Sequence, residues 1–317
     1  LVNKGNITNK GVELALNITP ISTDDVELSF GGNISFNKTQ IVNLESQPLL
    51  GFYENGVMTD RRFYFGNSIS RGQYFRYPAN VFVEGEESSL FYGFETDGIY
   101  QTEDTDLVEG AVAGDVRRVD QLTEDTDGDG ILDSGDGIID EKDRTFIGNP
   151  NPDYVYGFNF NLRYKGWNIS ALFNGVYGND IANGMLLQLD NAEGREFANI
   201  MPRAYYNAWR PDSQSNTHPR IGYRTEGQIA ITDRIIEDGS YLRLNNLTIG
   251  YDIAVSENKF INNLNVYLAG QNLFTWTNYS GYDPEVSTFL FTGLINGVDW
   301  NSGINARNVL MGVNIKF

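Results

Sequence analysis

The chain has 317 residues, a formal net charge of −19, 34 glycines, 13% aromatic residues and no cysteine. Without cysteine, a disulfide framework, a thiolate metal site and a cysteine nucleophile are all excluded. A helical membrane protein is also excluded, because no apolar stretch approaches the roughly 18 residues that a membrane-spanning helix needs, and the excess of acid argues against a nucleic-acid partner.

Seven segments alternate apolar and polar side chains with a period of two, which predicts β-strands with one apolar and one polar face. In chain order they cover residues 12–18, 26–37, 154–164, 167–177, 241–253, 263–272 and 308–317. The clearest, 154–164, has tyrosine, phenylalanine or leucine at every even position. In 241–253 the alternation changes phase by one residue, which predicts a β-bulge at Asn245 and Asn246.

The connections between these segments alternate between short turns and long loops. Short turns are expected around Pro20, at Lys165 and Gly166, and around residues 256–260. The long loops cover residues 38–152, 178–239 and 272–306. Because the two kinds alternate, all long loops leave from the same end of the sheet. Short turns on one side and long loops on the other are typical of an outer-membrane β-barrel.

The two faces of the segments differ in the same way throughout. One face is apolar, with aromatic residues near strand ends where an interfacial girdle would lie, and the other carries mostly Asn, Ser and Gly. A soluble β-sandwich with long loops is the alternative, but its polar face is usually charged. We therefore predict an all-β fold, an antiparallel transmembrane β-barrel segment with long extracellular loops. Seven strands is an odd number, whereas bacterial single-chain barrels have even numbers, so a larger barrel is expected.

Most of the negative charge lies in one segment, residues 84–143, which has 20 acidic and three basic residues. Within it, DTDGDGILDSGD at residues 125–136 has the spacing of an EF-hand calcium loop, closed by Asp instead of Glu. The second half of this pattern repeats seven residues later, at residues 136–143. Two overlapping ligand registers therefore exist, a first at residues 125–136 and a second that ends at Asp140 and Asp143, and one or two Ca²⁺ ions are expected within residues 125–143. The predicted ligands are Asp125, Asp127, Asp129, the backbone carbonyl of Ile131, Asp133, Asp136, Asp140 and Asp143.

No helical periodicity flanks the acidic loop, so we expect a calcium site that holds a long loop in place and does not act as a switch. A solvated acidic loop and a binding site for cationic substrates are the alternatives. Aromatic clusters in the first long loop are interpreted as its own core. A short helix around Pro202 is also expected, broken at that residue. The sequence contains no nucleophile motif that its only histidine, His218, could activate as a general base, so no enzyme is predicted.

Several strings resemble, in order, the C-terminal part of the SusC/RagA-type TonB-dependent outer-membrane transporters of Bacteroidetes. They are NKGVELALNITPI, RTFIGNPNPDYVYGFNFNLRYKGWNIS, DRIIEDGSYLRLNNLTIGY, GQNLFTWTNYSGYDPEV and VLMGVNIKF. The resemblance implies a barrel of 22 strands, of which residues 1–317 would form the C-terminal portion. The plug domain and the signal peptide of the family are then absent from these residues.

The resemblance also implies a function and partners. The function is import of oligosaccharides or peptides across the outer membrane, together with a SusD-like surface lipoprotein. Further partners would be the TonB complex, acting through the missing N-terminal part, the outer-membrane lipid, and the barrel-assembly machinery, which would recognise Phe317. The alternative function is a secreted, calcium-dependent, carbohydrate-binding β-sandwich.

Overall fold

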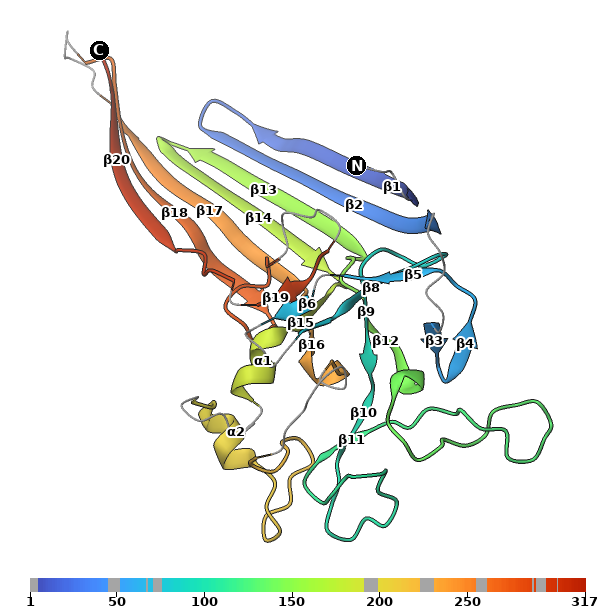
Figure 1. The fold of residues 1–317 in the computed structure, drawn as a ribbon. Coiled ribbons are helices and arrows are strands. Elements are labelled where there is room, and N and C mark those ends of the chain that lie inside the picture. Colours follow the sequence, from blue (N-terminus) through green and yellow to red (C-terminus); the bar gives the residue numbers. More distant parts are fainter. Residues whose placement is uncertain are drawn as a thin grey trace.

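One large antiparallel sheet dominates the computed structural model, which describes residues 5–44, 52–66, 68–70, 76–190, 199–222, 231–254, 261–286, 288, 295–300 and 302–317. The sheet has seven strands in the order β1-β2-β13-β14-β17-β18-β20 (Figure 1). They are β1 (Gly5–Ser22), β2 (Val26–Leu44), β13 (Tyr154–Tyr164), β14 (Trp167–Tyr177), β17 (Tyr241–Ile253), β18 (Asn263–Thr277) and β20 (Asn308–Lys316). All seven predicted strands are therefore present, and the predicted fold class is confirmed.

The first hairpin differs from its prediction because both strands pair beyond the alternating pattern. Strand β1 continues through Pro20 to Ser22, so the turn lies at residues 23–25 and not around Pro20. A register shift between Ile18 and Ile21 leaves Pro20 outside the ladder, and an edge strand tolerates a proline there. The first long loop begins after Leu44 instead of at residue 38, and the last one begins after Thr277 instead of at residue 272.

Two local predictions are confirmed by the backbone. Lys165 and Gly166 both have positive φ, 44° and 88°, as a two-residue turn between antiparallel strands requires. The bulge also forms, because Leu244 pairs with Phe173 while Asn246 pairs with the adjacent Leu172. The predicted turn around residues 256–260 lies outside the described residues.

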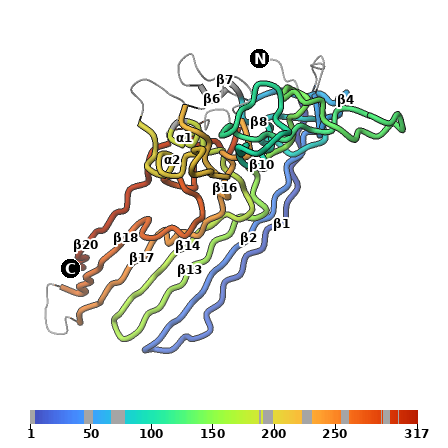
Figure 2. Tube along the Cα trace, turned by 90° about the horizontal axis from the view of Figure 1, so that it is seen from below, coloured from blue at the N-terminus to red at the C-terminus, as the bar shows by residue number. Residues whose placement is uncertain are grey.

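The long loops fold into a body of small sheets at one end of the large sheet, opposite the short turns (Figures 1 and 2). A four-stranded sheet contains β5 (Phe63–Phe65), β8 (Asn80–Val83), β9 (Leu90–Phe94) and β12 (Arg144–Gly148). A three-stranded sheet contains β15 (Asp180–Asn183), β16 (Ile236–Asp238) and β19 (Val298–Asp299). Three hairpins pair β3 (Phe52–Glu54) with β4 (Val57–Thr59), β6 (Ser68–Ser70) with β7 (Arg76–Pro78), and β10 (Thr96–Ile99) with β11 (Val116–Arg118).

The described helices are short: α1 (Gly184–Leu189), α2 (Pro202–Asn207), η1 (Glu141–Asp143) and η3 (Asp233–Ile235). None of the helices in the described ranges has the length and apolar character to span a membrane. The short helix expected around Pro202 is present as α2, but Pro202 begins it, because in the first turn its missing N–H costs no hydrogen bond. Residues 191–198, before this helix, lie outside the described residues.

The core of the loop body is shared by all three long loops. Phe91, Ala182, Ile231 and Val298 are buried in one cluster, although they come from loops far apart in the sequence. Phe63 and Tyr92 belong with Phe52 to a second buried cluster. The interpretation of the aromatic clusters as core is therefore confirmed for Phe63, Phe91, Tyr92 and Phe94, whereas the cluster at residues 74–77 lies outside the residues whose burial the structure describes. The three loops therefore share one core and form one folded unit.

Candidate functional site

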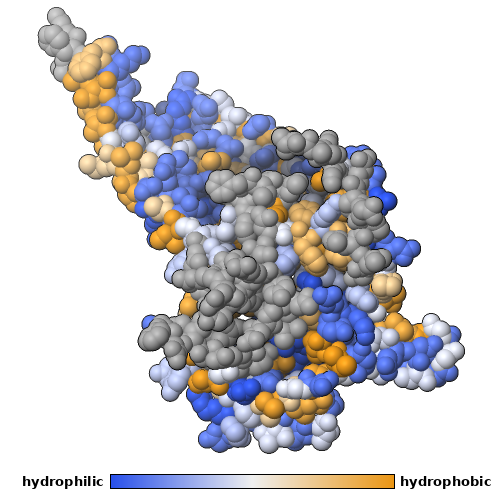
Figure 3. All heavy atoms as spheres, viewed as in Figure 1, coloured by the Kyte–Doolittle hydropathy of each residue, from blue (hydrophilic) through white to orange (hydrophobic). Residues whose placement is uncertain are grey.

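One face of the large sheet, which we call the outward face, is mostly apolar, and its side chains are exposed on both edge strands, β1 and β20. Leu14 and Leu16 on β1 are 60% and 64% exposed, and Val309 and Met311 on β20 are 68% and 74% exposed. At the β20 edge, Figure 3 shows hydrophobic residues beside hydrophilic ones, as two opposite faces require. A continuous apolar surface of this extent is a contact surface for lipid or protein.

Two layers of aromatic side chains bound this apolar face. Near the short turns, the rings of Trp167 and Tyr251 lie 4.9 Å apart between centroids. Near the loop body, the rings of Tyr154 and Tyr177 are stacked at 5.0 Å. Aromatic residues prefer the two membrane interfaces, where one end of the ring is apolar and the other is wet. The pattern is that of a membrane-spanning wall.

The inward face is polar and largely uncharged. Amide side chains lie over glycines on neighbouring strands, with Asn17 and Asn159 both over Gly31. Near the short turns, a hollow of about 450 Å³ is lined mainly by amides and hydroxyls, namely Asn161, Asn168, Ser170, Thr248, Asn265 and Asn314. A polar concave wall opposite a lipid-like face is what a barrel that encloses a wet interior needs.

A buried ion-pair network ties the last loop to the inner face of β17. The guanidinium of Arg243, whose side chain is 3% exposed, contacts the carboxylate of Asp283, which is 8% exposed. It also pairs with Glu285 at 2.7 Å and donates to the Thr275 hydroxyl at 3.1 Å. Asn305 donates to the second Asp283 oxygen at 2.6 Å. Sequence reasoning missed this network, although an arginine among the mostly uncharged residues of the inner face was a usable signal.

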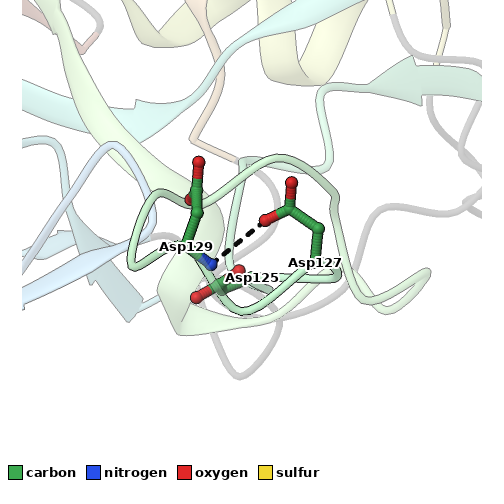
Figure 4. Close-up of side chains that lie close together, drawn as sticks. All are labelled: Asp125, Asp127 and Asp129. Atoms are coloured by element: carbon green, nitrogen blue, oxygen red, sulfur yellow. Dashed lines mark hydrogen bonds between the residues drawn. The ribbon is translucent and has the colours of Figure 1, made fainter.

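The acidic loop brings three predicted ligands together. One carboxylate oxygen each of Asp125, Asp127 and Asp129 lies within 4.8 Å of the other two, at the exposed end of the loop (Figure 4). The backbone N–H groups of Gly130 and Gly128 donate to Asp125 at 2.8 and 2.6 Å and hold the pKa of that carboxyl below its usual value. Exposed oxygens at this spacing suit a hard cation that takes several oxygen ligands.

The other predicted ligands have protein partners and lie outside this group of three. Asp133 accepts hydrogen bonds from the Thr126 backbone at 3.1 Å and from its hydroxyl at 2.8 Å. Asp136 pairs with Lys142 at 2.8 Å. Ile131 is 67% exposed, and its N–H donates to Asp129. The first register therefore needs a rearrangement of Asp133 and Asp136 before a single ion could contact all of them.

In the second register, Asp140 and Asp143 cap the short helix η1. Asp140 accepts from the Lys142 N–H at 2.8 Å, while Asp143 accepts from the N–H groups of Asp140 and Gln121, both at 2.8 Å. Asp143 is 1% exposed, and this burial raises its pKa to about 6. In this arrangement the two carboxylates therefore stabilise the loop through hydrogen bonds to its backbone.

Comparisons with known proteins identify relatives of this chain. No family model matches. The chain is 32% identical, over 99% of its length, to TonB-dependent receptor P3 of Formosa agariphila, and covers 29% of that receptor. It is 24% identical over 99% of its length to TonB-dependent receptor SusC of Bacteroides thetaiotaomicron, covering 27% of it.

The same span matches solved structures. The chain superposes on a structure of the RagAB peptide transporter with a TM-score of 0.73 and 22% identity, over 99% of this chain and 30% of that one. A structure of the RagAB importer in an open state gives a TM-score of 0.71. At this identity the likeness establishes the fold. The chain spans less than a third of the length of these relatives.

Proposed function

Because the chain is homologous over its full length to TonB-dependent receptors of the SusC and RagA type, we propose that it forms barrel wall and outer loops of an outer-membrane importer. The observation that carries the proposal is the seven-stranded sheet, whose apolar face is bounded by two aromatic layers and whose opposite face is polar. We place the loop body outside the cell and the short turns in the periplasm.

The cargo of the proposed importer is an oligosaccharide or a peptide, delivered with a SusD-like surface lipoprotein. The shared core of the three loops favours such a partner, because it presents them as one preformed surface. Energy would come from the TonB complex through parts of the receptor outside these residues. Phe317 is 79% exposed, and its recognition by the barrel-assembly machinery stays a prediction. The role is transport, not catalysis.

Fractionation of cells that produce the full receptor tests the proposed location. The receptor is expected in the outer-membrane fraction, and its gel mobility should change on boiling, as folded barrels in detergent resist unfolding. A freely soluble, monomeric full-length product would contradict the proposal. If residues 1–317 alone unfold cooperatively in plain buffer with a calcium-sensitive transition, the secreted sandwich is the better explanation. The exposed apolar face of the sheet argues against that outcome.

We also propose that Asp125, Asp127 and Asp129 hold one Ca²⁺ in the extracellular medium, with the remaining predicted ligands as candidates to complete the site. Their carboxylates repel one another when no cation is present. Calcium should therefore protect residues 119–143 of the full receptor from limited proteolysis, with a midpoint of about 0.1 to 1 mM. Magnesium at equal concentration should protect less, since it demands a smaller octahedral site.

A triple variant tests this site against general effects of charge. Asp125→Asn, Asp127→Asn and Asp129→Asn together should remove the calcium protection. Glu109→Gln is the matched control, because Glu109 is exposed in the same acidic segment but lies outside the group of three. Equal protection of the wild type and the triple variant would refute the assignment.

A further inference from the structure

Gly32, in the middle of β2, leaves a gap in the apolar outward face. It pairs with Leu16 on β1 and with Phe158 on β13, both on that face. A Cβ added to Gly32 would lie 3.7 Å from the Gly157 carbonyl oxygen and 3.9 Å from the Phe158 Cβ, which are ordinary contacts. Neither backbone conformation nor crowding therefore requires glycine here. By contrast, a Cβ on the adjacent Gly31 would collide with Asn159.

The gap at Gly32 is the floor of an open groove of about 460 Å³, which we call the Gly32 groove. Its lining is almost wholly apolar and includes Leu14, Leu16, Ile18, Phe30, Ile34 and Phe158. Glycine weakens a strand, and where neither a bulge nor a bend requires it, it often marks the close approach of a ligand or of another backbone. A hydrocarbon chain is the ligand whose chemistry matches this lining.

Towards the loop body, the Gly32 groove leads to a pair of lysines. On the same face Leu14 pairs with Ile34, then Val12 with Phe36, and then Lys10 with Lys38. A second groove of about 460 Å³ is lined by Lys10, Val12, Phe36, Lys38, Glu87 and Asn149. The apolar groove and the groove that contains the two lysines therefore follow one another along the same two strands.

The spacing of the two grooves matches half of a bilayer. Gly32 and Lys38 are six positions apart on β2, which corresponds to about 20 Å at roughly 3.4 Å per residue. With a strand tilt of about 40°, this is about 15 Å along the membrane normal, half of the roughly 30 Å hydrocarbon core. If Gly32 lies at mid-membrane, the lysines reach the interface on the loop side.

The lysine pair is poorly compensated by the protein. Like charges directly opposite each other destabilise an antiparallel pair. Lys38 contacts Glu87 at 3.3 Å, and Glu87 is shared with Asn149 at 3.1 Å. Within the described ranges, no carboxylate forms an ion pair with Lys10. Asp153 also lines the second groove, but its side chain lies against Gly178.

The geometry points to a binding site for a phosphorylated lipid of the outer leaflet, with an acyl chain in the Gly32 groove and the phosphate between Lys10 and Lys38. This inference rests on the proposed membrane location of the sheet. The phosphate would relieve the repulsion between the two lysines, and the acyl chain would cover the gap that Gly32 leaves.

Native mass spectrometry of the full receptor in neutral detergent tests the site, with lipid A as the phosphorylated probe. Lys10→Ala with Lys38→Ala should weaken binding by about thirtyfold, since each lysine contributes to the attraction. Gly32→Val should also weaken it, because the added side chain fills the groove without strain. Glu87→Gln should strengthen it by freeing Lys38. Lys165→Ala is the control, because Lys165 lies at the opposite end of the sheet, over Tyr164, and it should change nothing.

Two further probes separate this site from non-specific lipid contact. Dephosphorylated lipid A should bind weakly to the wild type, and inorganic phosphate should not displace lipid A. Equal binding of the dephosphorylated lipid would overturn the proposal, and so would full competition by free phosphate. Unchanged heat-dependent gel mobility of each variant shows that the barrel has folded. Failure of the lipid assay would then leave the proposed transport function intact.

Discussion

Replacing Arg243 with methionine is expected to destabilise the full receptor by about 3 to 5 kcal/mol, because one partner of a buried ion pair is removed while the other stays buried. Among the described residues, Asp283 would keep the Asn305 amide and the Glu285 N–H as its hydrogen-bond donors. The last loop should then detach from the inner face of β17.

Urea denaturation of the receptor in detergent, followed by tryptophan fluorescence, measures this loss. Arg163→Met is the matched control, because Arg163 also lies on the inner face but its ion pair with Glu27 is about half exposed. That control should cost less than about 1 kcal/mol. Adding Asp283→Leu to Arg243→Met should restore part of the stability, since no charge is then buried alone. Equal losses for both arginine variants would show that burial of the Arg243 network contributes nothing.

Truncating Phe91 to alanine is the second change with a large expected effect, about 3 to 5 kcal/mol, in the loop body. Phe91 is fully buried, and its ring lies against Gly148 and Gly297, at the point where the loops meet. The cavity should loosen the loops while the pairing of the large sheet persists, because no wall strand packs in that cluster.

Hydrogen exchange of the full receptor distinguishes the two regions. Amides of β8, β9 and β15 should exchange faster in Phe91→Ala, whereas those of β13 and β14 should be unchanged. Phe65→Ala is the control, since Phe65 is 39% exposed on β5, at the edge of the same sheet. Faster exchange throughout the wall strands would mean that the loop body and the wall unfold as one unit.

The seven strands of the large sheet, the wall strands, were predictable because the surroundings of each strand determine its own residue pattern. A strand with lipid on one side and a wet interior on the other must alternate, so the period of two identified all seven strands and even the bulge at Asn245. The predicted ends of the strands were less accurate, since β1 and β2 continue to pair beyond the residues that alternate.

The loop body was not predictable to the same degree, because its stability depends on contacts between distant segments. The Phe94 N–H donates to the Ile231 carbonyl, and the Asn80 amide donates to the carbonyl of Asn296. Its strands have two to five residues, too few to show a period. In the acidic loop, spacing identified Asp125, Asp127 and Asp129 as neighbours. It could not show that Asp143 would be buried as a helix cap.

Each long loop leaves the wall on one strand and returns on its hydrogen-bonded neighbour: β2 with β13, β14 with β17, and β18 with β20. A loop can therefore be exchanged for another of different length without altering the register of any wall strand. Receptors built in this way can diversify their outer surface by recombination while inheriting the wall unchanged. Because the three loops share one core, such exchanges should succeed best when all three loops are transferred together.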